Sequence, residues 1–340
     1  MHRWLHLLEK EAMTKGLVIG KFLPFHKGHQ ALIEFGANQC DELIVLVCAS
    51  NKEHISGTVR ENWISETFKD SSKIKVLAFH YDESDLPNTS NSSKEISNVW
   101  AKEFAKLLPD VTILFSSEPY GNYVSEFMGI DHIMFDEKRT KNPISGSILR
   151  ESPYENWAYL PDIVKLYFQK KIVILGTESV GKSTLAAYLT NQFSSVLVHE
   201  IGRDIIPDSK CFTEEQLKQI AEAHAVNIND AVQSLCPLVI IDTDIHITQS
   251  YAKHTFGSYL ELSGWIYDYN QADLYLYLVK EVPFIQDGSR LDENERNELD
   301  RSHRDTLAYF GIEFEELPGS YETRNSIAYQ LVSELVNRFK

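Results

Sequence analysis

The sequence contains little cysteine. Its four cysteines, Cys40, Cys48, Cys211 and Cys236, lie far apart in a chain of 340 residues, and none belongs to a CxxC pair. Small disulfide-stabilised domains and zinc ribbons both need cysteines clustered at short spacings. The cysteine content therefore excludes both classes and predicts a chain that works in a reduced, cytoplasmic compartment.

Long hydrophobic runs are also missing. The longest apolar run covers residues 43–49, whereas a membrane-spanning helix needs about 20 apolar residues. The amphipathic stretch at residues 1–15 has a basic start without the apolar segment that a signal peptide requires. We therefore expect no membrane span and treat residues 1–15 as an extension before the first domain.

Positive charge is scarce as well. Lysine and arginine total 33 against 49 aspartates and glutamates, which gives a formal net charge of −16. Residues 1–165 carry 18 basic and 23 acidic residues, and residues 166–340 carry 15 and 26. Acidic surfaces repel nucleic acids and anionic membranes. We therefore expect no nucleic-acid partner, and any contact with a polyanion must occur at a local basic site.

What the sequence does contain is two series of short apolar runs that alternate with helical patterns. At about 150 residues per domain, the length predicts two domains. Strands that are apolar throughout and alternate with helices predict parallel sheets covered on both faces, so the fold class is α/β. The predicted strands are residues 17–20, 43–48, 73–79, 111–115, 132–135, 171–175, 195–198, 238–241, 274–278 and 313–317, and the main predicted helices are 28–38, 58–69, 95–107, 213–233 and 322–339. The domain boundary is predicted at residue 168.

The second half contains a phosphate-binding pattern. Residues 176–183 read GTESVGKS, which is GxxxxGKS, directly after one strand and before a helix-like segment. In this pattern backbone N–H groups surround phosphate oxygens, Lys182 reaches the outer phosphates and the Ser183 hydroxyl binds Mg²⁺. Asp242 ends a buried strand, where it either holds Mg²⁺ or caps the next helix. The predicted ATP-binding residues of this half are Gly176, Glu178, Ser179, Val180, Gly181, Lys182, Ser183, Thr184 and Arg290.

Polar residues after the second strand of this half predict an acceptor site. Glu200 is placed to take the proton from an attacking hydroxyl or to hold ribose hydroxyls, and Arg203 to neutralise charge on the transferred phosphoryl group. A surface salt bridge is the alternative. Asp244 is expected to face the acceptor. This combination indicates a kinase.

Residues 287–304 carry four arginines, Arg290, Arg296, Arg301 and Arg304. Their spacing suits a helical lid that brings arginine over ATP and excludes water. A solvated helix with alternating charges is the alternative, above all for Arg301 and Arg304. Arg290 follows an Asp-Gly turn and is the first choice to reach the site.

The first half contains two further motifs. Residues 19–29 read IGKFLPFHKGH, which brings His26 and His29 to a helix start beside Gly28 and Lys21. Two imidazoles and a lysine there suit a triphosphate whose α-phosphorus is attacked. Metal binding by two histidines is the rival interpretation, but no third ligand is suitably spaced. Residues 144–150 read ISGSILR and predict a second phosphate cradle from Ser145, Ser147 and Arg150. The polar segment 83–94 is either a surface connection or a loop near substrate.

These motifs resemble a known family. The HxGH and ISxSxxR patterns are similar to the nucleotidylyltransferase superfamily, with Ser147 where threonine is frequent. From about Gly16 onward the chain resembles the bifunctional NadR family, in the order GKFLPFHKGH, Arg60 with Trp63, FSSEPYGNYV, DEKRT, ISGSILR, GTESVGKS, HEIGRD and IDTDIHITQSYA. Some members begin with a DNA-binding helix-turn-helix. About 15 residues precede the first strand here, too few for such a module.

The resemblance implies a Rossmann-like nucleotidylyltransferase domain at residues 16–168 and a P-loop ribosylnicotinamide kinase domain at 169–340. The kinase would phosphorylate nicotinamide riboside with ATP, and the first domain would adenylylate the resulting nicotinamide mononucleotide (NMN) with ATP, giving NAD and pyrophosphate. The implied catalytic residues are Lys21, His26, His29, Arg150, Lys182, Glu200 and Asp242.

The resemblance also assigns binding residues. Trp100 would stack on the nicotinamide ring, although core packing explains it equally well. The expected ATP-binding residues of the first domain are Gly20, Lys21, Phe22, His26, Gly28, His29, Ser116, Arg139, Ser145, Ser147 and Arg150. The expected substrate-binding residues are Trp100, Glu118, Tyr120, Glu200, Arg203, Asp242 and Asp244.

The expected partners are therefore small molecules: ATP, nicotinamide riboside, NMN and NAD, with Mg²⁺ as cofactor, held by Ser183 and Asp242. Assembly into a homo-oligomer is left open. Two other functions compete. In one, the kinase takes a different nucleoside or small metabolite. In the other, the chain is a nucleotide-sensing regulator, which the complete sets of catalytic motifs disfavour.

Overall fold

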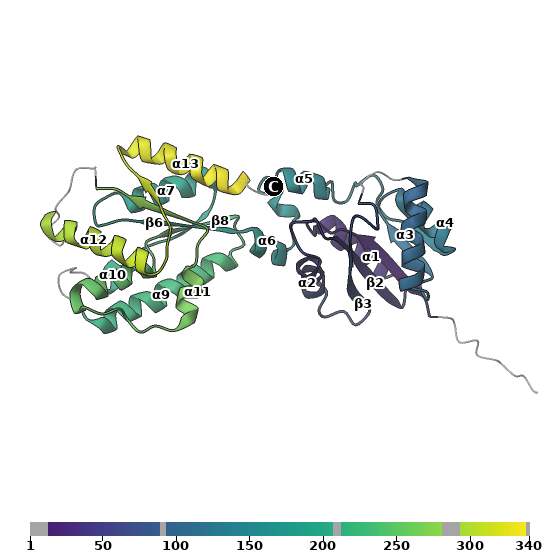
Figure 1. Cartoon of the computed structure of the whole chain (residues 1–340), viewed down its shortest axis with the longest axis horizontal. Helices are drawn as coiled ribbons and strands as arrows, with labels where there is room; N and C mark the ends of the chain where they lie inside the picture. Colours follow the sequence, from purple (N-terminus) through teal and green to yellow (C-terminus); the bar gives the residue numbers. More distant parts are fainter. Residues whose placement is uncertain (1–12, 89–92, 207–211, 281–292, 338–340) are drawn as a thin grey trace, which may run out of the picture. The chain divides into compact units, whose positions relative to one another are not determined.

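The computed structural model describes residues 13–88, 93–206, 212–280 and 293–337 (Figure 1). The chain divides into two compact units, residues 1–164 and 165–340. Helix α6 (Asp162–Phe168) spans this division. No described helix is both long enough and apolar enough to cross a membrane. In the part of the chain that the structure describes, Cys40, Cys48 and Cys236 are free thiols.

The first unit is built on a five-stranded parallel sheet. Its strand order is β3-β2-β1-β4-β5, so the central strand β1 lies between β2 and β4. The chain runs from β1 to β2 and β3 on one side and then crosses to β4 and β5 on the other side of β1. The crevice at the carboxyl ends of the strands, where the direction changes, is where α/β proteins bind ligands. The strands are β1 (Lys15–Gly20), β2 (Glu42–Ser50), β3 (Ile74–Tyr81), β4 (Ile113–Ser116) and β5 (Asp131–Met134).

Helices cover both faces of this sheet. One core cluster joins Leu17 and Ile19 of β1 to Ala101 and Phe104 of α3 and to Val124 of α4, so these two helices share a face. They also pack against each other (Figure 1). The helices are α1 (Lys27–Ala37), α2 (Gly57–Thr67), α3 (Lys94–Leu107), α4 (Tyr120–Met128) and α5 (Gly146–Glu151), followed by the 3₁₀ turn η1 (Trp157–Tyr159).

The second unit repeats this principle with a sheet of order β10-β9-β6-β8-β7, again parallel. Strand β6 is central and fully buried over most of its length, and the phosphate-binding pattern follows it directly. The strands are β6 (Lys170–Leu175), β7 (Val196–Val198), β8 (Leu238–Asp242), β9 (Leu274–Leu278) and β10 (Glu315–Leu317).

Helices α7 and α13 cover one face of this second sheet and α9 to α12 the other (Figure 1). Helix α9 begins with the capping box predicted by the sequence, in which Thr213 and Gln216 exchange hydrogen bonds between side chain and backbone. The helices are α7 (Lys182–Phe193), α8 (Gly202–Ile205), α9 (Glu214–Gln233), α10 (Ile245–Phe256), α11 (Gly264–Asn270), α12 (Glu293–Tyr309) and α13 (Tyr321–Asn337).

Candidate active sites

The turn between β1 and α1 holds the two histidines of the first unit in fixed positions. His26 is the N-cap of α1, and its Nδ1 accepts hydrogen bonds from the backbone N–H groups of Gly28 (3.1 Å) and His29 (3.4 Å). The His26 and His29 rings stack with centroids 3.6 Å apart. Phe22, which has a left-handed backbone (φ 49°), packs edge-on against His29. The motif therefore forms one rigid aromatic turn.

Burial favours the neutral form of both imidazoles. Burial, and secondarily the positive charge of Arg139, lower the pKa of His26 to about 3. Burial, followed by the neighbouring His26 and Arg139, holds the pKa of His29 well below 6.5. Because Nδ1 of His26 accepts hydrogen bonds, its proton is on Nε2, which is free to donate to an anion. The α1 N-terminus adds a favourable dipole for negative charge.

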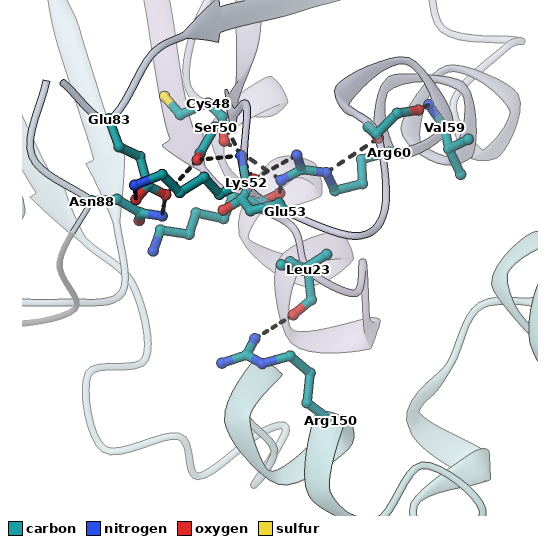
Figure 2. Close-up of polar contacts among 12 residues, drawn as sticks. Leu23, Cys48, Ser50, Lys52, Glu53, Val59, Arg60, Glu83, Asn88 and Arg150 are labelled. Carbon is teal, nitrogen blue, oxygen red and sulfur yellow. Dashed lines mark hydrogen bonds and ion pairs between the residues drawn. The ribbon is translucent and has the colours of Figure 1, made fainter. Parts of the chain in front are cut away.

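The ISGSILR segment lies against this turn. Ser145 caps α5 by accepting a hydrogen bond from the Ile148 N–H (3.3 Å). The Arg150 guanidinium donates to the Leu23 carbonyl of the histidine turn (2.5 Å) and to the Ser147 hydroxyl (3.3 Å), and Figure 2 shows the contact with Leu23. The fold thus brings together two motifs that are distant in the sequence.

A cavity of about 610 Å³ opens over these two motifs. Glu118 and Arg139 form an ion pair at its wall (2.9 Å), and the Tyr120 hydroxyl donates to the Ile19 carbonyl (2.8 Å). Trp100 also lines it, with its indole N–H donating to the Pro87 carbonyl (3.1 Å). The predicted residues that line the cavity are Gly20, Lys21, Phe22, His26, Gly28, His29, Trp100, Glu118, Tyr120, Arg139, Ser145, Ser147 and Arg150.

Ser116 is the one predicted residue of the first unit that does not line this cavity. It is buried, and its hydroxyl lies 2.9 Å from Nε2 of His132 and 3.0 Å from the Glu118 carbonyl. A Cβ at Gly121 would come within 2.1 Å of that hydroxyl, so only glycine allows α4 to approach so closely. Ser116 therefore positions the turn that carries Glu118.

In the second unit, the loop between β6 and α7 has the backbone that its glycines allow. Gly176 (φ 136°) and Gly181 (φ 96°) both occupy conformations unfavourable for other residues, and a Cβ at Gly181 would lie 2.6 Å from the Tyr321 ring. Lys182 begins α7 and donates to the Thr177 carbonyl (3.1 Å). The lysine is thus folded against the loop in which phosphates would be held.

Asp242 and Ser183 lie together beneath this loop. The Ser183 hydroxyl donates to Oδ2 of Asp242 (2.6 Å), whereas Oδ1 of Asp242, although buried, has no partner among the described residues. A carboxylate and a hydroxyl are hard oxygen ligands that fit Mg²⁺, and the unpartnered oxygen marks an unfilled coordination capacity. The described residues contain no group of three or more His, Cys, Asp or Glu suited to a metal. Bound Mg²⁺ would therefore take its other ligands from phosphate and water.

The acceptor side of the second unit is a cavity of about 390 Å³. Asp244 lines it and is also the N-cap of α10, since it accepts the N–H groups of His246 (3.0 Å) and Ile247 (3.4 Å) and contacts Nδ1 of His246 (2.5 Å). The helix-capping role considered for Asp242 thus belongs to Asp244. The predicted residues that line the cavity are Gly176, Glu178, Ser179, Gly181, Lys182, Ser183, Thr184, Glu200, Asp242 and Asp244.

Other predicted residues of the kinase half lie elsewhere. The Val180 side chain is fully buried and does not line the cavity. Arg203 lies in α8, but its side chain is not among those described, and Arg290 lies outside the described residues.

Three arginines of the predicted lid lie in the described part of α12, and their surroundings differ. Nε of the buried Arg296 lies 3.3 Å from the Thr177 hydroxyl in the phosphate loop. Arg301 is exposed, and Arg304 pairs with Glu316 and Asp300, away from the loop. The alternative of a solvated, charge-paired helix is correct for Arg301 and Arg304.

Sequence comparisons agree with this architecture. Residues 15–83 match the family described as "Citrate lyase ligase C-terminal domain", and residues 171–324 match "AAA domain". The trifunctional NAD biosynthesis/regulator protein NadR of Escherichia coli (strain K12) is 30% identical over an alignment 365 positions long, which covers 99% of this chain and 87% of that protein. This chain belongs to the NadR family.

Solved structures show the same fold. The crystal structure of a NadR protein in complex with NR has a TM-score of 0.65 at 21% identity and covers 96% of this chain and 98% of that one. A NadR protein in complex with NAD and AMP-PNP has a TM-score of 0.61 at 22% identity, covering 95% and 96%. The predicted α/β fold, a nucleotidylyltransferase domain followed by a P-loop kinase domain, is therefore confirmed.

Arg60 supports the first site of this NadR-family chain, and sequence reasoning gave it no role. Its side chain is fully buried and donates to the Lys21 carbonyl (2.6 Å) and to the Ser56 carbonyl (3.3 Å). It also forms an ion pair with Glu53 (2.7 Å), which Figure 2 shows. A buried charge is tolerated only when it is paired and hydrogen-bonded. Arg60 therefore fixes the backbone of the loop that carries Lys21.

A second network of polar contacts, on the left of Figure 2, ends at Asn88. Glu83 accepts hydrogen bonds from the Ser50 hydroxyl and from Nδ2 of Asn88 (2.5 Å), and Lys52 lies 3.4 Å away (Figure 2). A carboxylate can only accept, so the amide nitrogen must face Glu83. Oδ1 of Asn88 then has no partner among the described residues. Asn88 and Trp100 both line the cavity. Asn88 belongs to the polar segment 83–94, so this part of the segment lies at the site.

Arg324 of α13 plays a comparable part in the kinase unit. Its buried guanidinium donates to the Val180 carbonyl of the phosphate loop (2.7 Å) and to the Val279 carbonyl after β9. The sequence gave no signal for it, because the residues it joins are far apart in the chain. His224 of α9 was missed as well, although its place on the buried face of that helix follows the apolar spacing.

Proposed function

We propose that this NadR-family chain makes NAD in two ATP-dependent steps. The second unit phosphorylates nicotinamide riboside to NMN, and the first unit transfers the adenylyl group of another ATP to NMN, releasing pyrophosphate. The observation that carries the proposal is that each unit has its own cavity, lined by a nearly complete set of phosphate-handling residues. Family membership supports it, since the E. coli relative is named for NAD biosynthesis.

In the first unit, a phosphate oxygen of NMN attacks the α-phosphorus of ATP, and the bond to pyrophosphate breaks. The neutral His26 and His29 donate N–H groups to the phosphoryl oxygens, while Lys21 and Arg150 neutralise the charge that develops on the reacting and leaving groups. Arg150 is already held over the histidine turn by its contact with Leu23. The transfer is direct, so no covalent nucleophile is needed.

The first cavity favours NMN, whose pyridine ring carries a carboxamide, over the analogue that carries a carboxylate. Glu83 holds the Asn88 amide so that its oxygen, an acceptor, remains available. The carboxamide of NMN has N–H donors that match this oxygen, whereas the carboxylate of an acid analogue would be repelled by it and by the charge on Glu83. Trp100, which lines the same cavity, offers an aromatic surface for the pyridine ring.

In the second unit, a ribose hydroxyl of the nucleoside attacks the γ-phosphorus of ATP. Glu200 takes the hydroxyl proton or holds the sugar, and Lys182 neutralises charge on the transferred group. Ser183 and Asp242 would hold Mg²⁺, which supplies charge neutralisation at the phosphates when bound. Mg²⁺ binding and a cytoplasmic location stay predictions, and assembly into a homo-oligomer stays open.

The test uses the purified full chain with ATP, MgCl₂ and nicotinamide riboside, and follows NMN and NAD by chromatography. We expect NMN to form first and NAD to follow, both dependent on the riboside. If NMN is adenylylated but the riboside is not phosphorylated, the kinase acts on a different acceptor. If neither product forms, a regulatory role without catalysis is the better explanation.

A further inference from the structure

His224 lies in the wall of the kinase cavity without an assigned role. It belongs to the buried face of α9, between Ala221 and Ala225, and its side chain is 6% exposed. It lines the cavity, and its Nε2 has no hydrogen-bond partner in the part of the chain that the structure describes. A buried polar atom without a partner is costly, so such atoms are most often completed by a ligand or water.

The residues around His224 indicate what kind of ligand atom would form a hydrogen bond with Nε2. Burial lowers the pKa of His224 below 6.5, although the negative charges of Asp244 and Glu200 and, last, the His199 backbone act to raise it. A neutral imidazole forms a hydrogen bond at Nε2 either as donor or as acceptor, according to which ring nitrogen carries the proton. A hydroxyl group, which can both donate and accept, suits either case.

Two carboxylates line the same cavity as His224. Asp244 is held in place by the hydrogen bonds that cap α10, and Glu200 follows β7. Carboxylates only accept hydrogen bonds and carry negative charge, so the matching ligand must bring hydrogen-bond donors, and a phosphate group would be repelled.

We propose that His224 binds the nucleoside acceptor of the kinase through a hydrogen bond between Nε2 and a ribose hydroxyl. The sugar of a nucleoside brings several hydroxyl groups, which can donate to the two carboxylates and form a hydrogen bond with the imidazole. The inference rests on the proposed kinase function and adds a specificity-determining residue to it. His224 selects acceptors that carry a sugar hydroxyl at this position and takes no part in ATP binding.

The test is steady-state kinetics of the full chain with nicotinamide riboside varied at saturating ATP. We expect His224→Ala to raise the KM for the riboside about tenfold or more, as the loss of one hydrogen bond inside a closed site predicts. The KM for ATP and the adenylylation of NMN should stay within about twofold of wild type. His224→Gln, whose side-chain amide can both donate and accept a hydrogen bond, should recover part of the affinity.

A matched control separates binding from packing. Ile228 lies one turn further along the same buried face of α9 and does not line the cavity. Ile228→Ala should lower the melting temperature without changing the KM for the riboside. If Ile228→Ala raises that KM as much as His224→Ala does, His224 acts only through packing and the proposal is overturned.

Nicotinic acid riboside provides the second arm, since it keeps the sugar but lacks the amide. If His224 binds the ribose, His224→Ala must weaken both ribosides by the same factor. A loss confined to nicotinamide riboside would assign His224 to the carboxamide and overturn the proposal. If wild-type chain phosphorylates nicotinamide riboside and His224→Ala leaves its KM unchanged, only this inference fails. If wild-type chain phosphorylates no riboside, both it and the proposed kinase function fail.

Discussion

At the scale of single residues, Asn88 turns its amide nitrogen toward Glu83 and leaves its oxygen at the cavity wall. Asn88→Asp replaces that nitrogen with a carboxylate oxygen that Glu83 repels. We expect the KM for NMN to rise about tenfold or more, because one hydrogen bond is lost and like charges are added. Adenylyltransferase kinetics at saturating ATP measure this change.

The double variant Asn88→Asp with Glu83→Gln is the control for this prediction. The glutamine amide can donate to the new aspartate, which removes the repulsion and restores a fixed pair. We expect it to recover part of the affinity for NMN. An unchanged KM in Asn88→Asp alone, in a protein with wild-type melting temperature, would exclude Asn88 from substrate binding.

His26 makes the stability of the first unit depend on pH. Its pKa is about 3 in the folded chain, and the ordinary value of 6.5 applies to the unfolded chain. Between these values the unfolded chain binds more protons, so the free energy of unfolding falls as the pH drops below 6.5. The slope from one histidine is at most about 1.4 kcal/mol per pH unit. Above 6.5 this contribution to stability is fully present.

Urea unfolding of the full chain between pH 4.5 and 7.5 measures this slope. His26→Asn is the matched variant, because asparagine also caps helices well but does not titrate. We expect the variant to lose less stability than wild type as the pH falls. Equal slopes for the two proteins would show that His26 is protonated to the same extent in both states.

At the scale of elements, α13 holds the phosphate loop from outside the motif. Arg324 donates to the carbonyls of Val180 and Val279. Arg324→Lys loses the two-pronged guanidinium, and a hydrogen bond from a charged group contributes about 1.5–3 kcal/mol. We therefore expect the KM for ATP in the kinase reaction to rise about tenfold or more. Kinase assays with ATP varied measure it.

Arg301→Lys is the control for Arg324→Lys, because Arg301 is an exposed arginine of the same unit. It should leave the KM for ATP within about twofold of wild type. Adenylylation of NMN should be unaffected by either variant. If Arg324→Lys changes thermal stability but not the KM for ATP, α13 supports the fold without positioning the loop.

Elements differ in how well the sequence predicts them. Each strand that the structure describes overlaps a predicted one. The central strand β6 is the clearest, because a strand buried on both faces is a continuous apolar run. The outer strands β3 and β10 are partly exposed, and their apolar signal is weaker. Helix α4 was not predicted as a helix, because its segment YGNYVSEFM contains Gly121 and Asn122, which are weak helix formers. That helix depends on its packing over Ser116, which Gly121 permits. Tertiary packing therefore stabilises α4, although the helix propensity of its residues is low.

Site residues also differ in how well the sequence predicts them. Motifs that are contiguous in sequence, such as residues 19–29 and 176–183, were predicted, and most of their residues line the cavities. Arg60 and Arg324 were not assigned roles, because each contacts a carbonyl that only folding brings near. Asn88 contacts Glu83, five residues away, and lay unassigned within the polar segment 83–94. His224 could have been found from the sequence. Leu217, Ala221, Ala225 and Ile228 follow a helical spacing that puts His224 on the same buried face of α9.

At the scale of the whole molecule, the excess of negative charge contrasts with the two cavities. The formal net charge is −16, yet Lys21, Arg139 and Arg150 line the first cavity and Lys182 lines the second. Positive charge is thus scarce overall and present where phosphates would bind. This distribution suits small anionic nucleotides, since an extended polyanion would also meet the acidic surface around each cavity.

Each cavity is lined by residues of one unit only, so the two reactions should be separable by mutation. Lys182→Ala should lower the rate of NMN formation from riboside at least about 100-fold, since it removes the charge at the transferred phosphoryl group, and leave adenylylation of NMN intact. His29→Ala should do the reverse. Supplying each variant in turn with riboside and with NMN measures both rates, and mixing the two variants should restore NAD formation from riboside. If either substitution abolished both activities in a folded protein, the two units would share one catalytic site.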